Sequence, residues 1–92
     1  MNTWEDYKNH VKATDRAEKG NMEIIEELTS LISSIIARRN ELGMSQRDLA
    51  AECGLPQSSI ARIESLKIVP KLDTLLKLMH PLGLKLQLIN RG

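Results

Sequence analysis

Residues 44–64 read MSQRDLAAECGLPQSSIARIE and decide the fold, because they predict two short helices joined by a tight turn. Ser45, with Asp48 three residues later, forms a capping-box pattern that starts the first of these helices. Gly54 can take the left-handed conformation that ends a helix, and Pro56 then directs the chain into the second helix.

The outward face of the second helix is small and polar except for one long cation. At helical spacing Ile60 and Ile63 point inward, where any compact helical bundle would place them. The side chains left outside are Gln57, Ser58, Ala61 and Arg62. Base edges in the major groove of DNA form paired hydrogen bonds, adenine with Gln and guanine with Arg. The face therefore predicts base reading by Gln57, Ser58 and Arg62.

These two helices resemble the helix-turn-helix of phage-type repressors, the Cro and Xre-like family. The matching positions are Gln46, Ala50, Gly54, Ile63 and Glu64. The resemblance covers residues 31–83 and implies an all-α, lambda-repressor-like DNA-binding domain of four or five helices. It also implies that Gln46 reaches the bases from the start of the first helix of the motif.

The same resemblance implies a structural ion pair between Arg39 and Glu64. Such a pair would be partly buried, so its disruption should cost more than the loss of a surface salt bridge. Two positions depart from the family pattern, because Pro56 and Lys71 stand where a hydroxyl side chain often caps a helix. Because of these two departures, the sequence does not fix the first residues of the helices that follow Pro56 and Lys71.

Charge is distributed unevenly along a chain whose net charge is only +1. Residues 1–30 carry seven acidic and four basic side chains, whereas residues 31–92 carry five acidic and nine basic ones. DNA phosphates need local cations rather than a basic protein overall. The expected phosphate contacts are Ser45, Ser59, Arg38, Lys67 and Lys71, although any single lysine could equally be an ordinary solvated one.

Composition favours a single helical domain in a reducing compartment. The 92 residues are 41% hydrophobic but only 2% aromatic, so aliphatic side chains must build the core. Cys53 is the single cysteine, which leaves no partner for an intramolecular disulfide or a cysteine-based metal site. With neither a signal-peptide layout nor a bilayer-length apolar run, we expect a cytoplasmic protein without cofactor or membrane contact.

Three segments are predicted along the chain. Residues 1–20 show a short helical pattern around Trp4, followed by a run of polar residues. We expect this segment to be helical in part and flexible in part. Residues 21–83 form the DNA-binding domain, and residues 84–92 follow it. Within the domain, Asn21 is expected to cap a long helix that Gly43 ends.

The inward stripe of that long helix is expected to comprise Ile24, Ile25, Leu28, Leu31, Ile32, Ile35, Ile36, Arg39 and Leu42. A last helix should close the core with Leu72, Leu75, Leu76 and Met79. Pro81 ends it, because proline disfavours helical conformation in the preceding residue.

Alternation near the carboxyl end predicts a β-strand. Leu84, Leu86 and Leu88 alternate with polar residues. A lone strand cannot satisfy its own backbone groups, so this one should pair with the same strand of a second copy and form a homodimer. The other interpretation, a frayed tail, would expose three leucines.

A terminal strand after such a domain, with an acidic segment before it, resembles the antitoxins of toxin–antitoxin operons within this repressor family. The resemblance implies a transcriptional repressor that binds its own palindromic operator as a dimer and neutralises a small basic protein toxin. Acidic residues 1–30 are a reasonable surface for such a partner, although they could also simply cover the long helix.

Two other functions are alternatives to this one. A stand-alone phage-type or metabolic repressor would share the DNA chemistry and lack the toxin. An enzyme would need a catalytic constellation, and His10 and His80 stand in no motif with ligand or triad spacing. We therefore expect no enzymatic activity.

Overall fold

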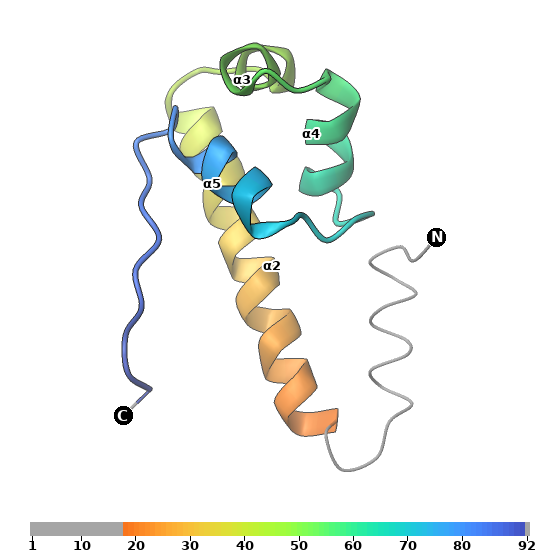
Figure 1. Ribbon diagram of the computed structural model, residues 1–92, viewed down its shortest axis with the longest axis vertical. Helices are drawn as coiled ribbons and strands as arrows, with labels where there is room; N and C mark the ends of the chain where they lie inside the picture. The colour runs from red at the N-terminus through yellow and green to blue at the C-terminus, as the bar shows by residue number, and fades with distance from the viewer. Residues whose placement is uncertain (1–17, 92) are drawn as a thin grey trace.

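The computed structural model describes the chain from residue 18 to residue 91, and this part is all-α. Its helices are α2 (Glu18–Glu41), α3 (Gln46–Cys53), α4 (Gln57–Glu64) and α5 (Leu72–Met79) (Figure 1). The helical pattern expected around Trp4 lies outside the described residues. None of the described helices is long and apolar enough to cross a membrane.

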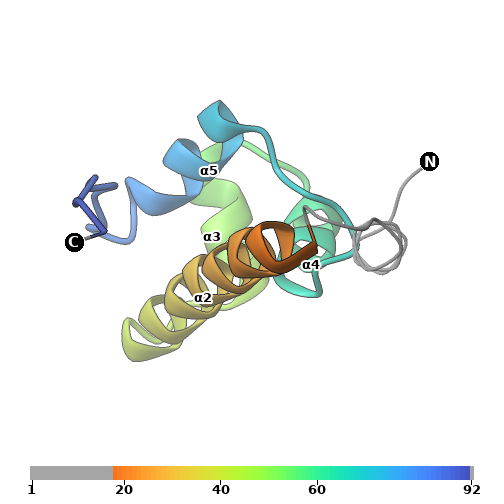
Figure 2. The ribbon, with the colours of Figure 1, turned by 90° about the horizontal axis from the view of Figure 1, so that it is seen from below.

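Helix α2 is the longest helix of the described chain, and the other three pack against it. Helices α3, α4 and α5 gather around its carboxyl-terminal half, while its amino-terminal half extends beyond them (Figures 1 and 2). The helix already includes Gly20 and Asn21, so the prediction that Asn21 caps it was wrong. A single helical glycine costs only about 1 kcal/mol relative to alanine, which an otherwise strong helix tolerates.

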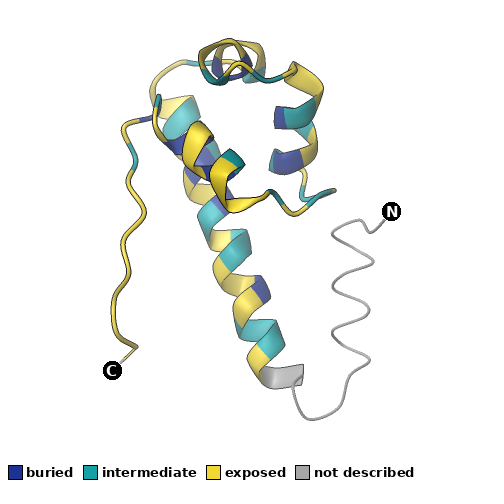
Figure 3. Ribbon diagram, viewed as in Figure 1, coloured by how far each residue is buried: buried dark blue, intermediate teal, exposed yellow. Residues whose placement is uncertain are grey.

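The main core is aliphatic, as the composition predicted. It lies where the four helices face one another (Figure 3). Its buried members are Ile32, Ile35, Leu49, Ala50, Ile60, Ile63, Leu75, Leu78, Met79 and Leu82. A second, smaller cluster surrounds Ile25 farther along α2, and it is described below.

Several residues of the expected apolar stripes lie at the surface instead. Ile24 on α2, Leu42 just after it, and Leu72 and Leu76 on α5 are exposed. Neighbouring residues on a helix diverge by about 100°, so Ile24 turns away from the face on which Ile25 is buried. On α5 the inward positions are taken by Leu75, Leu78 and Met79.

The carboxyl-terminal segment, residues 84–91, runs as an extended chain along α2 and contains no β-strand (Figure 1). The predicted strand is therefore not found in the single chain, where no second strand supplies the ladder of hydrogen bonds. Leu84 packs against the main core, but Leu88 is 92% exposed. Arg91 holds the far end through Glu23 and Glu27 of α2, at 2.8 Å each.

Candidate nucleic-acid interface

The start of α3 is fixed by the predicted capping box. The backbone N–H of Asp48 donates to Ser45 Oγ at 3.0 Å. In return the Ser45 N–H donates to Asp48 Oδ2 at 2.9 Å. These bonds satisfy amide groups that a helix start otherwise leaves without partners. They also hold the pKa of the Asp48 carboxyl below its ordinary value, the backbone bond contributing most.

We expect this cap to weaken in acid. Because the folded-state pKa of Asp48 is lowered, its contribution to stability is present above the unfolded-state pKa and is lost as pH falls through the folded-state value. Urea titrations of the wild type and of Asp48→Asn across the acidic range measure this contribution. The two proteins should converge in stability at the acid end, and a difference that stays constant with pH would contradict the assignment.

The turn between α3 and α4 is tight and has the predicted glycine. Gly54 has φ of 70°, the left-handed region that glycine enters without a steric penalty. The amide groups of Gly54 and Leu55 both donate to the carbonyl of Ala50 and close the end of α3. Helix α4 then starts after Pro56 without a side-chain cap. The turn therefore sets α4 at a steep angle to α3 (Figure 1).

An ion pair anchors the end of α4 to α2. Arg39 donates to both carboxylate oxygens of Glu64, from Nε at 2.6 Å and from Nη2 at 2.9 Å. Its Nη1 donates to the carbonyl of Met44, just before α3. The Arg39 and Glu64 side chains are only 11% and 7% exposed. This is the pair that the family resemblance implied, and it joins three helices at one point.

The same carboxylate also begins a chain of hydrogen bonds that leads to the outer face of α4. Gln46 Nε2 donates to Glu64 Oε1 at 3.0 Å. Gln57 Nε2 donates in turn to Gln46 Oε1 at 2.8 Å. The Gln46 amide is thus bound on both sides, whereas Gln57 keeps its carbonyl oxygen and a second N–H for another partner.

Sequence reasoning missed the link between the two glutamines. The available signal was that each is the first residue of its own helix, on either side of one tight turn. Gln46 is half-buried and Gln57 is exposed. The structure therefore places Gln46 behind Gln57, where it restrains the conformation of the outer side chain.

The remaining predicted residues, apart from Arg38, lie on α4, at the start of α3 or in the loop that follows α4. Ser58 and Arg62 are exposed on α4, with Ser59 half-buried in its first turn, and Lys67 and Lys71 are exposed in the following loop. Ser45 and Gln57 stand at the starts of α3 and α4, whereas Lys67 and Lys71 lie between α4 and α5, with Lys71 directly before α5.

Arg38 is the exception among the predicted contacts. Its Nε donates to the carbonyl of Leu82 at 2.9 Å, and its guanidinium lies 3.6 Å from Glu41. The structure thus engages Arg38 where the carboxyl-terminal segment leaves the core, rather than at α3 or α4.

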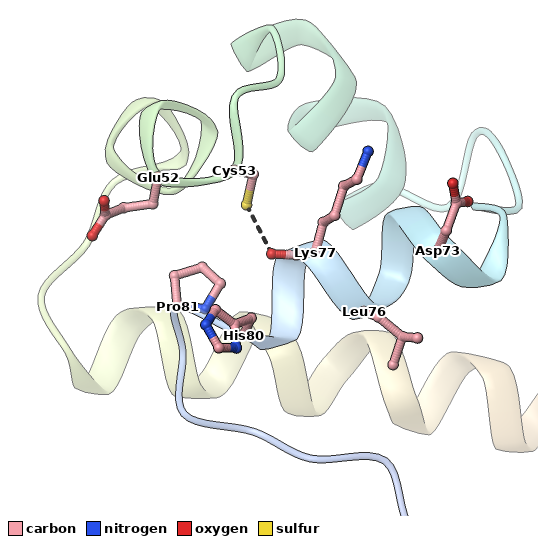
Figure 4. Close-up of a pocket in the computed structure, with 7 residues that line it drawn as sticks. All are labelled: Glu52, Cys53, Asp73, Leu76, Lys77, His80 and Pro81. Carbon is pink, nitrogen blue, oxygen red and sulfur yellow. Dashed lines mark hydrogen bonds between the residues drawn. The ribbon is translucent and has the colours of Figure 1, made fainter.

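A shallow groove of about 680 Å³ lies between α3 and α5 (Figure 4). Within it the thiol of Cys53 donates to the carbonyl of Lys77 at 3.3 Å. Burial, with a smaller contribution from Glu52, raises the pKa of this thiol, which disfavours the thiolate form. Among the described residues no three His, Cys, Asp or Glu side chains come together to hold a metal ion.

Comparison with known proteins agrees with this geometry. The helix-turn-helix family model matches residues 35–89, more than half of the chain. The chain therefore belongs to the helix-turn-helix family, in its Cro/Xre-type branch. No solved structure matches it significantly.

Two relatives are informative. An uncharacterized HTH-type transcriptional regulator of Haemophilus influenzae is 34% identical over 86 residues, covering 94% of this chain and 83% of the relative. The antitoxin HigA1 of Mycobacterium tuberculosis is 32% identical over 77 residues, which are 84% of this chain. The aligned part spans about half (52%) of that antitoxin's length.

Proposed function

We propose that the protein is a sequence-specific transcriptional repressor that places α4 in the major groove of DNA. The observation that carries this proposal is the hydrogen-bonded chain from Arg39 to Gln57, because it presents a restrained amide on the outer face of α4. A side chain already held in place loses less conformational entropy when it binds. Membership of the helix-turn-helix family supports the same function.

Individual roles follow from position. Gln57, Ser58 and Arg62 would read base edges from α4, and Gln46 would act mainly by holding Gln57. Ser45, Ser59, Lys67 and Lys71 would contact phosphates. Because Arg38 is bound to Leu82 and Glu41, we now propose that it braces the start of the carboxyl-terminal segment. The proposal assigns the chain no catalytic role and no cofactor.

Lys71 offers a simple test of the phosphate assignments. Lys71→Ala should weaken binding to specific and random DNA alike, because a phosphate contact carries no sequence information. The slope of log affinity against log salt concentration should fall in magnitude by about one. Fluorescence anisotropy at several salt concentrations measures both quantities. A loss confined to the specific duplex would show instead that Lys71 contributes to base recognition.

We propose further that the repressor acts as a homodimer on a palindromic operator. The extended segment 84–91 supports this, because Leu86, Leu88 and Ile89 are exposed on it and could be covered by the same segment of a second copy. Leu84, at its base, is already packed on the core. A symmetric dimer would place its two α4 helices in successive major grooves, about 34 Å apart.

We propose, more specifically, that this repressor is the antitoxin of a toxin–antitoxin module. Its support is the resemblance to the antitoxin HigA1 and the acidic amino-terminal half of α2, where Glu23, Glu26 and Glu27 lie close together. Such a surface would suit a small basic protein. The alternative is a stand-alone repressor in the cytoplasm without a toxin.

Capture of the tagged chain from its host distinguishes these two functions. Mass spectrometry of bound proteins and sequencing of bound DNA should recover a small basic protein together with the promoter of the chain's own operon. Glu26→Gln, which leaves the ion pairs of Arg91 with Glu23 and Glu27 in place, should then reduce capture of the protein while leaving the DNA. Recovery of DNA alone would support the stand-alone repressor and reject the antitoxin role.

A further inference from the structure

Leu66 occupies a backbone conformation that is unusual for leucine. Its φ is 62°. Among the residues that the structure describes, it is the only one other than glycine with a positive φ. It lies two residues after the end of α4, the helix proposed to read the bases, and Ser65 stands between them. Its N–H donates to the carbonyl of Ile63, and the N–H of Lys67 donates to the carbonyl of Arg62. This is the Schellman arrangement that closes a helix, in which glycine is the residue of lowest cost.

The side chain explains why leucine stands there. Leu66 is half-buried and packs against both hydrophobic clusters of the molecule, the main core and the smaller cluster around Ile25. Met22 and Leu28 complete that smaller cluster on α2. A glycine at position 66 would relieve the strain of the turn but would remove this bridge. The strained conformation is therefore retained by packing across two elements.

The bridge connects the DNA-facing part of the molecule to a region outside it. Ile25 lies in the amino-terminal half of α2, before residue 35, where the match to the helix-turn-helix family begins. The loop that follows α4 runs beside α2 in both ribbon views (Figures 1 and 2). Lys67, an assigned phosphate contact, is the next residue after Leu66.

We propose that the contact between Ile25 and Leu66 is a positioning contact, through which the amino-terminal half of α2 sets the end of α4 and the placement of Lys67 on DNA. The proposal rests on the DNA-binding function proposed above. It makes this half of α2 a control surface, because any change in the packing of Ile25 is transmitted to a residue beside the recognition helix.

Hydrogen exchange tests the contact without DNA. Ile25→Ala should raise the exchange rates of the Leu66 and Lys67 amides by about fivefold or more relative to the amides of α3, such as that of Leu49. Ile24→Ala is the matched control, since Ile24 is 54% exposed while Ile25 is 3% exposed. Equal acceleration in α3 and at residues 66–67, or none at either, would overturn the proposal. Ile25→Val gives a milder change should the alanine variant not fold.

Binding then tests the functional consequence. The probe is a 30-bp duplex that the wild-type protein enriches from a random pool. Ile25→Ala and Leu66→Gly should each weaken binding by about threefold to tenfold, and the double variant should lose no more than either alone, as expected for residues in contact. Ile24→Ala should bind like the wild type. Additive losses, or unchanged affinity in Ile25→Ala, would contradict the coupling.

The two proposals can fail separately. If the wild-type protein enriches no duplex, the DNA-binding function is rejected, while hydrogen exchange still decides whether α2 sets the end of α4. If the duplex is enriched but the exchange rates of the Leu66 and Lys67 amides are the same in Ile25→Ala as in the wild type, the DNA-binding function stands and the positioning contact is rejected.

Discussion

Arg39→Met should lower the free energy of unfolding by about 3–5 kcal/mol, because it leaves the carboxylate of Glu64 buried without its counter-ion. The arginine also donates to the carbonyl of Met44, so the start of α3 loses a support at the same time. Small domains have only about 5–15 kcal/mol of stability in total. Urea unfolding followed by circular dichroism measures the loss.

Arg91→Met is the matched control. Arg91 forms ion pairs with both Glu23 and Glu27, yet its side chain is 71% exposed, and exposed pairs contribute about 0–1 kcal/mol. Adding Glu64→Leu to Arg39→Met should recover part of the lost stability, since it removes the stranded charge. Equal losses in Arg39→Met and Arg91→Met would show that burial of the pair has no energetic consequence.

Gln57→Ala should weaken binding to the operator by about 1–3 kcal/mol, the usual cost of losing a paired hydrogen bond to a base. Binding to random DNA should hardly change, because the side chain carries sequence information rather than charge. Gln46→Ala should weaken operator binding less, by about 0.5–1.5 kcal/mol, as the Gln57 side chain would then have to be ordered on binding.

Gln87→Ala supplies the control for these amide truncations. Gln87 is exposed in the carboxyl-terminal segment, which runs along α2 rather than along α3 or α4 (Figure 1). Its truncation should leave operator affinity unchanged in fluorescence anisotropy. If Gln46→Ala abolished binding more completely than Gln57→Ala, Gln46 would have to contact the bases itself, as the family resemblance first implied.

The helix-turn-helix could be predicted from sequence because its determinants are local. The capping box of Ser45 and Asp48 and the left-handed turn at Gly54 are each read from a few neighbouring residues. The long-range pair of Arg39 and Glu64 was accessible only through the family resemblance, since nothing in composition or spacing links positions so far apart.

Features that depend on three-dimensional packing could not be predicted in the same way. Alternation in residues 84–88 indicates an extended chain, and the chain there is extended, but a strand also requires a partner. Periodicity places Ile24 and Ile25 on one stripe, yet only packing decides which of them is buried. The positive φ of Leu66 is likewise invisible in the sequence, because leucine does not favour it.

Selection of duplexes from a random pool, repeated with the wild type and with Gln57→Ala, tests the account most directly. The wild type should enrich a palindrome whose half-sites are about 34 Å apart, one helical turn of DNA. Gln57→Ala should lose its preference at one position of each half-site and keep the rest. A wild type that enriches no sequence, or a variant that enriches the same sequence with equal preference at every position, would contradict the assignment of α4 as the base-reading helix.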